Sequence, residues 1–214
     1  MQIAKNIFKA YDIRGLAATE LSPELAYSLG RAFVVFLRNH NLLKPGQAVV
    51  AGRDMRGTSP SLQQALMRGA SDEGVDVVDI GLVSTPLFNF ACANYPEHAG
   101  GVMVTASHNP AQYNGFKITL GDGLPIGESS GMGEIKELVV NFNFDYKDEE
   151  KSFPQKEVLA DYLKKIFSIV SPDSIRPMKI VIDAGNGMAK VSIPEVLNSL
   201  PCHCPRRLQS SSDG

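Results

Sequence analysis

Cysteine and tryptophan are scarce in this sequence. Its 214 residues include no tryptophan and only three cysteines, Cys92, Cys202 and Cys204. Three cysteines do not make the paired framework of a small disulfide-stabilised domain. The Cys-His-Cys run at residues 202–204 lacks the second group of ligands that a structural zinc site needs. We therefore expect reduced thiols and no zinc site.

Long apolar runs and an excess of one charge are also missing. No apolar run approaches the roughly 20 residues that a transmembrane helix requires. The first residues contain Lys5 but no apolar stretch with a cleavage site, so they do not resemble a secretory signal. The net charge is −2 and no basic block is present, which argues against a nucleic-acid-binding surface. These absences predict a cytoplasmic protein that binds neither membrane nor nucleic acid.

Segments of helical periodicity alternate with short apolar runs along the first two thirds of the chain. Ser22 before Pro23, and Ser59 before Pro60, predict two helix starts, because serine caps a helix and proline suits its first turn. The runs that resemble buried strands occupy residues 48–51, 75–80 and 101–105. This order is typical of helices packed on a parallel or mixed sheet. The sequence therefore predicts an α/β fold, with a mixed or parallel sheet covered by helices.

A charged, aperiodic stretch at residues 141–154 predicts a boundary between two domains. The first domain would comprise residues 1–145. We expect residues 155–200 to begin a second, incomplete α/β domain of the same type. Its predicted elements are a helix at 155–170, a strand at 178–183, a tight turn at 184–187 and a helix that includes residues 193–200.

The last segment, residues 201–214, does not continue this pattern. It contains one leucine and no valine, isoleucine or phenylalanine. A buried strand of the Val/Ile-rich kind would be expected there in an α/β domain. We expect a disordered tail that arises from a frameshift or a mis-assembled end.

A candidate site follows the apolar run at 101–105. Ser107 lies where a strand is expected to end, and open α/β sheets bind ligands at the carboxyl ends of their strands. The pair Asn109-Pro110 predicts a turn. The pair Asn114-Gly115 predicts a hairpin connection, after which a strand would carry Lys117 back toward the serine.

Ser107 does not fit a serine hydrolase. His108 is its immediate neighbour, whereas a Ser-His-Asp triad draws its members from separate segments, and the nucleophile-elbow pattern is absent. A serine that carries a phosphoryl group fits better, because the added charge of about −1.5 to −2 requires nearby cations. An ordinary polar loop between strands is the alternative.

Four motifs in order carry a resemblance to a known family. Thr-Ala-Ser-His-Asn-Pro at 105–110, followed by Tyr-Asn-Gly-Phe-Lys at 113–117, is similar to the phosphoserine signature of the phosphohexomutases. Residues 8–15, 52–59 and 183–187 match further motifs of that family. The chain is identified as a member of the phosphomannomutase/phosphoglucomutase family over about residues 6–200. The most similar members are bacterial enzymes that act on both mannose and glucose phosphates.

This resemblance implies a hexose phosphate substrate, which is converted between its 1- and 6-phosphates. Ser107 would be the phosphoserine that donates to a sugar hydroxyl and takes phosphate back from a bisphosphorylated hexose intermediate. The phosphate on Ser107 would also be one ligand of Mg²⁺. His108 and Lys117 would contact the substrate and transfer protons.

The resemblance also implies that Tyr11 and Arg14 bind substrate from an N-terminal loop. A guanidinium suits phosphate because it forms two parallel hydrogen bonds. Alternatively, Arg14 forms a surface ion pair with Asp12 or Asp54, and Tyr11 is a half-buried packing residue. Arg53 and Asp54 are expected to hold the loop, and the turn after Asp183 has no catalytic role.

Three parts of a complete family member are absent: the aspartate-rich metal loop, the sugar-reading loop and the loop that binds the unreacting phosphate. Gly121-Asp122-Gly123 is expected to be only a local turn. Phosphoryl transfer depends on positioning and charge neutralisation, so an inactive truncated fragment is an alternative. Phosphoglucosamine mutase specificity is another alternative. We expect the complete protein to be monomeric.

Overall fold

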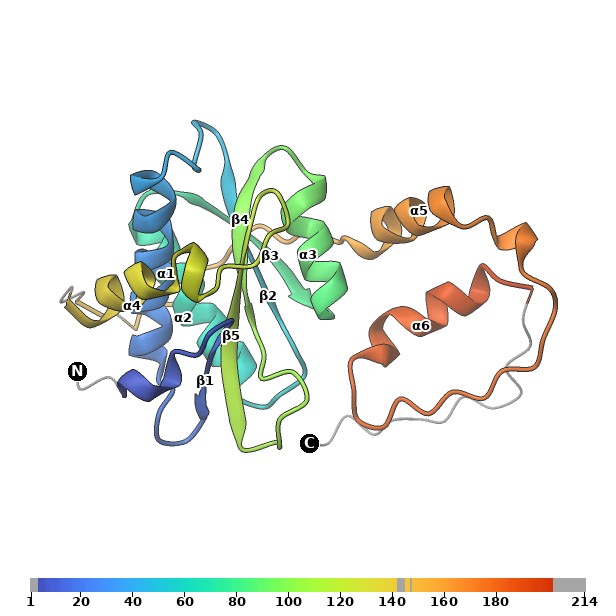
Figure 1. The fold of residues 1–214 in the computed structure, drawn as a ribbon, viewed down its shortest axis with the longest axis horizontal. Coiled ribbons are helices and arrows are strands. Elements are labelled where there is room, and N and C mark those ends of the chain that lie inside the picture. Colours follow the sequence, from blue (N-terminus) through green and yellow to red (C-terminus); the bar gives the residue numbers. More distant parts are fainter. Residues whose placement is uncertain (1–3, 142–144, 147, 202–214) are drawn as a thin grey trace.

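The computed structural model describes residues 4–141, 145, 146 and 148–201. A five-stranded mixed sheet in the order β1-β5-β4-β2-β3 forms its centre (Figure 1). The strands are β1 (Ile13–Leu16), β2 (Ala48–Arg53), β3 (Asp76–Leu82), β4 (His98–Val104) and β5 (Tyr113–Leu120). The pairs β2–β3 and β2–β4 are parallel, whereas β5 is antiparallel to both β4 and β1. The predicted α/β class and mixed sheet are confirmed.

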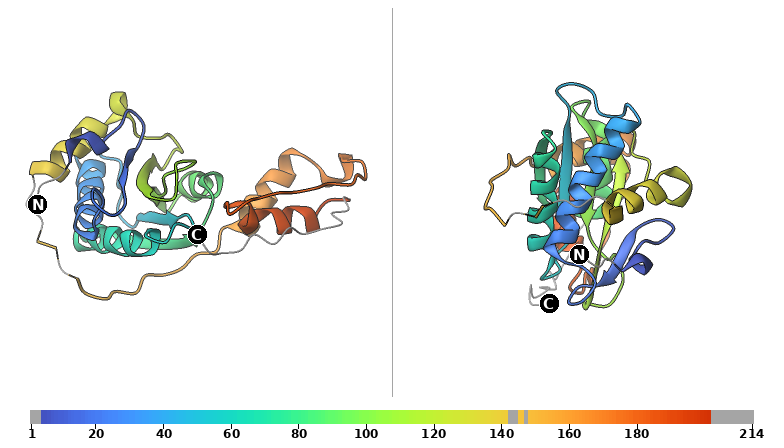
Figure 2. Two further views of the ribbon diagram at one scale, coloured as in Figure 1. Left: turned by 90° about the horizontal axis from the view of Figure 1, so that it is seen from below. Right: turned by 90° about the vertical axis from the view of Figure 1, so that its left-hand side faces the viewer.

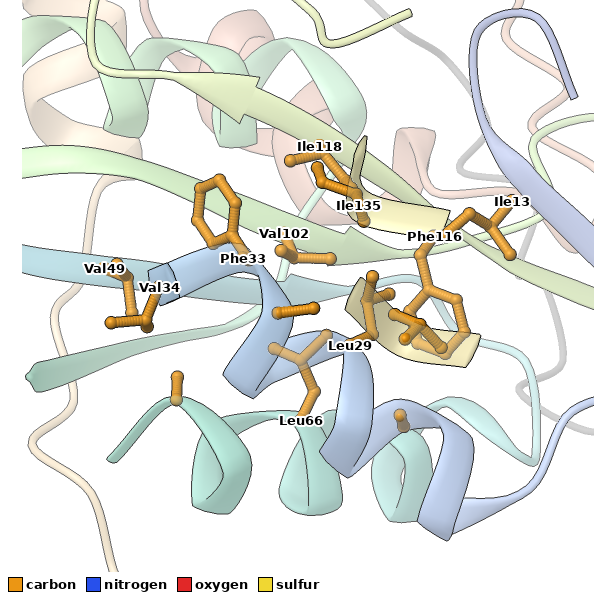
Figure 3. Packing of buried hydrophobic residues seen from close by; sticks show 14 of the residues in the cluster. Ile13, Leu29, Phe33, Val34, Val49, Leu66, Val102, Phe116, Ile118 and Ile135 are labelled. Atoms are coloured by element: carbon orange, nitrogen blue, oxygen red, sulfur yellow. The ribbon is translucent and has the colours of Figure 1, made fainter. Parts of the chain in front are cut away.

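Helices cover both faces of the sheet (Figures 1 and 2). One face packs against α1 (Pro23–Asn39), α2 (Ser59–Asp72) and α4 (Met132–Asn141), and the other packs against α3 (Thr85–Asn94). The short 3-10 turns are η1 (Lys5–Ile7), η2 (Glu128–Ser130) and η3 (Pro172–Ser174). Figure 3 shows the larger core, where Val102, Phe116 and Ile118 of the sheet meet side chains of the helices such as Phe33. The sheet is therefore packed on both faces, and the loops at its strand ends extend from a buried core.

The predicted helix starts are observed at α1 and α2. Ser22 caps α1 by accepting a hydrogen bond from the backbone N–H of Leu25 at 3.3 Å, and Pro23 is the first helical residue. The two helices pack with their backbones in close approach. A Cβ atom on Gly30 would lie 2.1 Å from the carbonyl oxygen of Leu66, and one on Gly69 would lie 2.0 Å from that of Tyr27. Glycine is therefore required at both positions of this helix crossing.

The predicted hairpin connection at Asn114-Gly115 is wrong, because both residues lie inside β5. Gly115 pairs with Arg14 of the edge strand β1, and a Cβ there would lie 2.2 Å from the carbonyl oxygen of Ile13. Asn114 is fully buried and its Nδ2 donates to Oγ of Ser59 at 3.0 Å. A close strand contact and a buried polar network explain this pair instead of a turn.

The second predicted domain has less regular structure than expected. The helix α5 (Leu159–Ile169) agrees with the helix predicted at 155–170, and α6 (Ala189–Asn198) includes most of the residues 193–200 that were predicted to lie in a helix. They lie to one side of the central sheet (Figures 1 and 2) and contain no buried residue. The predicted strand at 178–183 is wrong: only Lys179 and Ile182 form isolated bridges. Val181 there is 83% exposed, so this segment lacks the neighbouring layers that a parallel strand requires.

The segment before α5 packs onto the central sheet. Asp79 of β3 forms a parallel bridge with Gln155, and Val158 is buried in the cluster around α3. The division into residues 1–145 and 155–200 stays a prediction. Of the predicted tail at 201–214, residues 202–214 lie outside the described part. No helix among the described residues is long and apolar enough to cross a membrane.

Candidate functional site

The candidate nucleophile Ser107 lies on the loop that follows β4, at the carboxyl end of the parallel strands. Its side chain is exposed, and its backbone has a φ of 56°. This left-handed conformation costs a residue with a Cβ about 1–2 kcal/mol relative to the ordinary regions. Such strain is retained only when the surrounding contacts hold it in place.

A buried carboxylate beneath the loop supplies part of this support. Asp54 follows β2 and is 3% exposed. Its Oδ2 accepts a hydrogen bond from Oγ1 of Thr105 at 2.7 Å, and its Oδ1 accepts one from Oγ of Ser59 at 2.7 Å. Asp54 therefore joins the end of β2, the start of α2 and the end of β4, as the sequence led us to expect for a residue that holds the loop.

The guanidinium of Arg56 supplies further support for the loop conformation. Its Nε donates to Oδ2 of Asp54 at 3.1 Å, and its two terminal nitrogens donate to backbone carbonyl oxygens of the loop. These acceptors are Ser107 at 3.1 Å, Asn109 at 2.7 Å, Pro110 at 2.8 Å and Tyr113 at 2.9 Å. One side chain thus binds the loop from the serine to the start of β5.

Sequence reasoning missed Arg56, although it lies in the quoted motif at residues 52–59. That motif led us to assign Arg53 and Asp54 to the loop. Arg53 instead ends β2, where its carbonyl oxygen accepts a hydrogen bond from the backbone N–H of Val83 at 3.0 Å. The usable signal was the spacing of Asp54 and Arg56, which allows the carboxylate to pair with the guanidinium two residues later.

The imidazole of His108 lies beside the serine. Its Nδ1 is 3.3 Å from Oγ of Ser107, and both side chains are exposed at the tip of the loop. The next residue closes the turn, because the N–H of Asn109 donates to the carbonyl oxygen of Ala106 at 3.1 Å. A hydroxyl and an imidazole at this distance can exchange a proton.

The predicted cations Arg14 and Lys117 both bind Asp12, not the Asp54 carboxylate beneath the serine loop. Asp12, only 7% exposed, accepts a hydrogen bond from the guanidinium of Arg14 and one from Nζ of Lys117 at 3.4 Å. The pairing of β1 with β5 explains the contact, since Ile13 lies opposite Phe116. The alternative of an ion pair between Arg14 and Asp12 is therefore observed.

The predicted site residues form two groups. Among the described residues, no hydrogen bond or ion pair joins Ser107 and His108 to the cluster of Asp12, Arg14 and Lys117. Both groups are connected through the β4–β5 pairing, in which Lys117 lies opposite Met103. Tyr11 is 75% exposed, so the alternative of a half-buried packing tyrosine is wrong.

The part of the chain that the structure describes holds no cluster of three His, Cys, Asp or Glu side chains suited to a metal ion. Asp122 accepts a hydrogen bond from the backbone N–H of Leu124 at 2.9 Å, as in the local turn expected there.

The chain also matches the model of a known protein family. Residues 5–144 match the family described as phosphoglucomutase/phosphomannomutase, alpha/beta/alpha domain I. The chain belongs to this family, as its motifs led us to expect.

Curated relatives bear names of mutases. The chain is 40% identical over 189 residues to a phosphomannomutase of Vibrio cholerae serotype O1, covering 88% of this chain and 40% of the relative. It is 38% identical over 187 residues to a phosphoglucomutase of Neisseria meningitidis serogroup B, covering 87% of this chain and 38% of the relative. The chain thus spans less than half the length of these relatives.

A solved structure has the same fold. A phosphoglucomutase/phosphomannomutase family protein of Burkholderia thailandensis superposes with a TM-score of 0.82 at 34% identity. The superposition covers 99% of this chain and 46% of that protein. The likeness therefore includes nearly all of the chain.

Proposed function

We propose that this chain supplies the phosphoserine part of an enzyme that interconverts hexose 1-phosphate and hexose 6-phosphate, with mannose or glucose as the sugar. The observation that carries the proposal is the placement of Ser107, exposed on a loop whose backbone carbonyl groups are bound by Arg56 and whose Thr105 hydroxyl is bound by Asp54. The family membership and the names of the relatives support the reaction class.

In this proposal Ser107 carries the phosphoryl group between two positions of the sugar. Phosphoserine Oγ gives its phosphoryl group to a hydroxyl of the bound hexose phosphate, which forms a bisphosphorylated hexose. The second transfer returns the other phosphoryl group to Oγ and releases the isomeric monophosphate. His108 is suited to move the proton that each transfer displaces, because its Nδ1 lies 3.3 Å from Oγ of Ser107.

The cations at β1 and β5 would neutralise the charge of the substrate. Arg14 and Lys117 share the single carboxylate of Asp12, so the cluster carries a net positive charge. A guanidinium and an ammonium with spare donors can bind phosphate oxygens. Tyr11 is exposed two residues before strand β1 and is suited to contact the sugar.

Mg²⁺ would neutralise the transferred group. A phosphate on Ser107 would supply one oxygen ligand, and the described residues hold no cluster of three His, Cys, Asp or Glu side chains to supply the others. We therefore propose that the 214-residue chain alone has no mutase turnover and that further segments are required. The choice between mannose, glucose and glucosamine phosphates would also depend on those segments.

The test compares two proteins. One is the 214-residue chain, and the other joins it to the segments of the Vibrio cholerae phosphomannomutase that follow the matched part; we call this the extended protein. Both are assayed with hexose 1-phosphates, Mg²⁺ and a bisphosphorylated hexose. We expect turnover from the extended protein and none from the 214-residue chain. Equal rates from both would contradict the dependence on further segments, and no turnover with any hexose phosphate would contradict the proposed reaction.

A further inference from the structure

A closed ring of hydrogen bonds passes through both peptide groups of Ser107. The N–H of Ser107 donates to Oγ1 of Thr105 at 2.9 Å, and that hydroxyl donates to Oδ2 of Asp54 at 2.7 Å. The same Oδ2 accepts from Nε of Arg56 at 3.1 Å, and Nη2 of Arg56 donates to the carbonyl oxygen of Ser107 at 3.1 Å. The ring therefore begins and ends on the one loop residue whose backbone is left-handed.

This arrangement determines the direction in which the serine side chain leaves the backbone. The N–H and the C=O of Ser107 lie on either side of its Cα, so fixing both groups fixes the direction of the Cα–Cβ bond. Serine with free peptide groups prefers the extended or right-handed helical regions, in which the side chain points elsewhere. A φ of 56° is thus the conformation that the ring selects.

The two charged side chains of the ring are buried, which restricts their movement. The side chains of Asp54 and Arg56 are only 4% and 9% exposed. Hydrogen bonds between charged partners are strengthened away from water, and removal of one partner leaves the other unsatisfied. Ser59 and the N–H of Arg56 also bind Asp54 through Oδ1, so the carboxylate has little freedom to move.

We propose that Asp54 and Arg56 are positioning residues that hold Ser107 in its left-handed conformation and so direct Oγ for phosphoryl transfer. The inference rests on the proposed function of Ser107. Neither residue exchanges a phosphoryl group or a proton with the substrate. They act through the peptide groups of Ser107 and, on the Asp54 side, through the hydroxyl of Thr105.

The first measurement concerns the loop alone. Amide hydrogen exchange at Ser107 is compared by NMR in the 214-residue chain and in its variants Arg56→Gln, Thr105→Val and Thr105→Ser. Arg38→Gln is the matched control, because Arg38 also donates to a carbonyl oxygen and pairs with a carboxylate, both of Glu73. We expect Ser107 to exchange at least about tenfold faster in Arg56→Gln and Thr105→Val. Thr105→Ser, which keeps the hydroxyl, and Arg38→Gln should match the unaltered chain.

The amide of Val50, in the centre of the sheet, reports whether each variant is folded. Thr105→Val preserves side-chain volume, so the test remains available if Arg56→Gln does not fold. Unchanged exchange at Ser107 in the folded Thr105→Val and Arg56→Gln variants would overturn the inference.

The second measurement concerns transfer. The extended protein and the same variants are exposed to a saturating bisphosphorylated hexose, and the rate of phosphoryl uptake on Ser107 is measured by peptide mass. We expect a loss of about 10²-fold in Arg56→Gln and uptake near the original rate in Thr105→Ser. A folded Arg56→Gln variant with the original rate would overturn the inference. Failure of the unaltered extended protein to take up phosphate would contradict the proposed function, while the exchange experiment still decides the role of the ring.

Discussion

Oγ of Ser107 lies 3.3 Å from Nδ1 of His108, the next residue in the chain. This contact between neighbours occurs at the strained residue of the loop, where φ is 56°. The position of the imidazole is thus linked to the backbone conformation of the serine.

His108→Gln in the extended protein tests proton transfer at this contact. An amide can form hydrogen bonds but cannot carry the proton, so we expect kcat to fall by about 10²-fold or more with little change in KM. Steady-state kinetics with a hexose 1-phosphate provide the measurement. A rise in KM at unchanged kcat would show instead that the imidazole only binds substrate.

Two substitutions at Ser107 test the backbone strain without the hydroxyl. Ser107→Gly should be more stable than Ser107→Ala by about 1 kcal/mol, because glycine adopts a positive φ without the Cβ penalty. Urea unfolding of the 214-residue chain measures the difference. The control pair is at Ser61, an exposed residue inside α2. There glycine should be less stable than alanine, and the same order at both positions would contradict the strained conformation.

The crossing of α1 and α2 gives a test of packing. Gly30→Ala should destabilise the fold by about 3 kcal/mol, because its Cβ would lie 2.1 Å from the carbonyl oxygen of Leu66. Gly133→Ala in α4 is the control, since nothing lies within 4 Å of a Cβ there. It should leave stability unchanged or raise it by about 0.5 kcal/mol. Thermal unfolding of both variants checks the contrast, and similar losses from both would contradict the close crossing.

The buried imidazole of His98 predicts a pH dependence of stability. Burial lowers the pKa of His98 below its ordinary value of 6.5, against the opposing effect of the hydrogen bond between Nδ1 and the carbonyl oxygen of Ala91. The unfolded chain therefore binds a proton more readily than the folded chain as the pH falls below about 6.5, and stability should decrease. Nε2 of His98 has no hydrogen-bond partner among the described residues, which adds to the cost of protonation.

His98→Asn should reduce this dependence, because the amide keeps a donor for Ala91 but does not titrate. Urea unfolding at several pH values between 7.5 and 5 is the measurement. The hydrogen bonds from Lys156 and His40 lower the pKa values of Glu97 and Glu134. Protonation of these carboxylates therefore reduces stability only at lower pH, below about pH 4.5. An equal slope in the variant between pH 6.5 and 5 would exclude His98 as the cause.

Local patterns predicted the elements that depend on local physics. The start of α1 follows from the Ser22 cap and from proline in the first turn, and the start of α2 follows from proline alone. The buried run of β2 follows from its composition. The α/β class and the position of Ser107 after a strand were predictable for the same reason. These features require only residues that are close together in the sequence.

The features that the sequence did not predict depend on contacts between segments that are far apart in the chain. Asn114-Gly115 has the composition of a turn, but β1, about a hundred residues earlier, requires a glycine there. Arg56 binds a loop that begins 51 residues later, so its role could not be read from its neighbours. The segment at 178–183 has the composition of a strand but no adjacent strand to form a ladder in the described structure.

We propose that Ser107 carries the phosphoryl group. The most direct measurement is to treat the extended protein and its Ser107→Ala variant with a bisphosphorylated hexose and Mg²⁺, and then locate the added phosphate by peptide mass. We predict one phosphoryl group on the peptide that contains Ser107, no phosphate on the alanine variant, and a loss of turnover by orders of magnitude with the fold intact. Phosphate on a different residue, or near-normal turnover of a folded Ser107→Ala variant, would contradict the account.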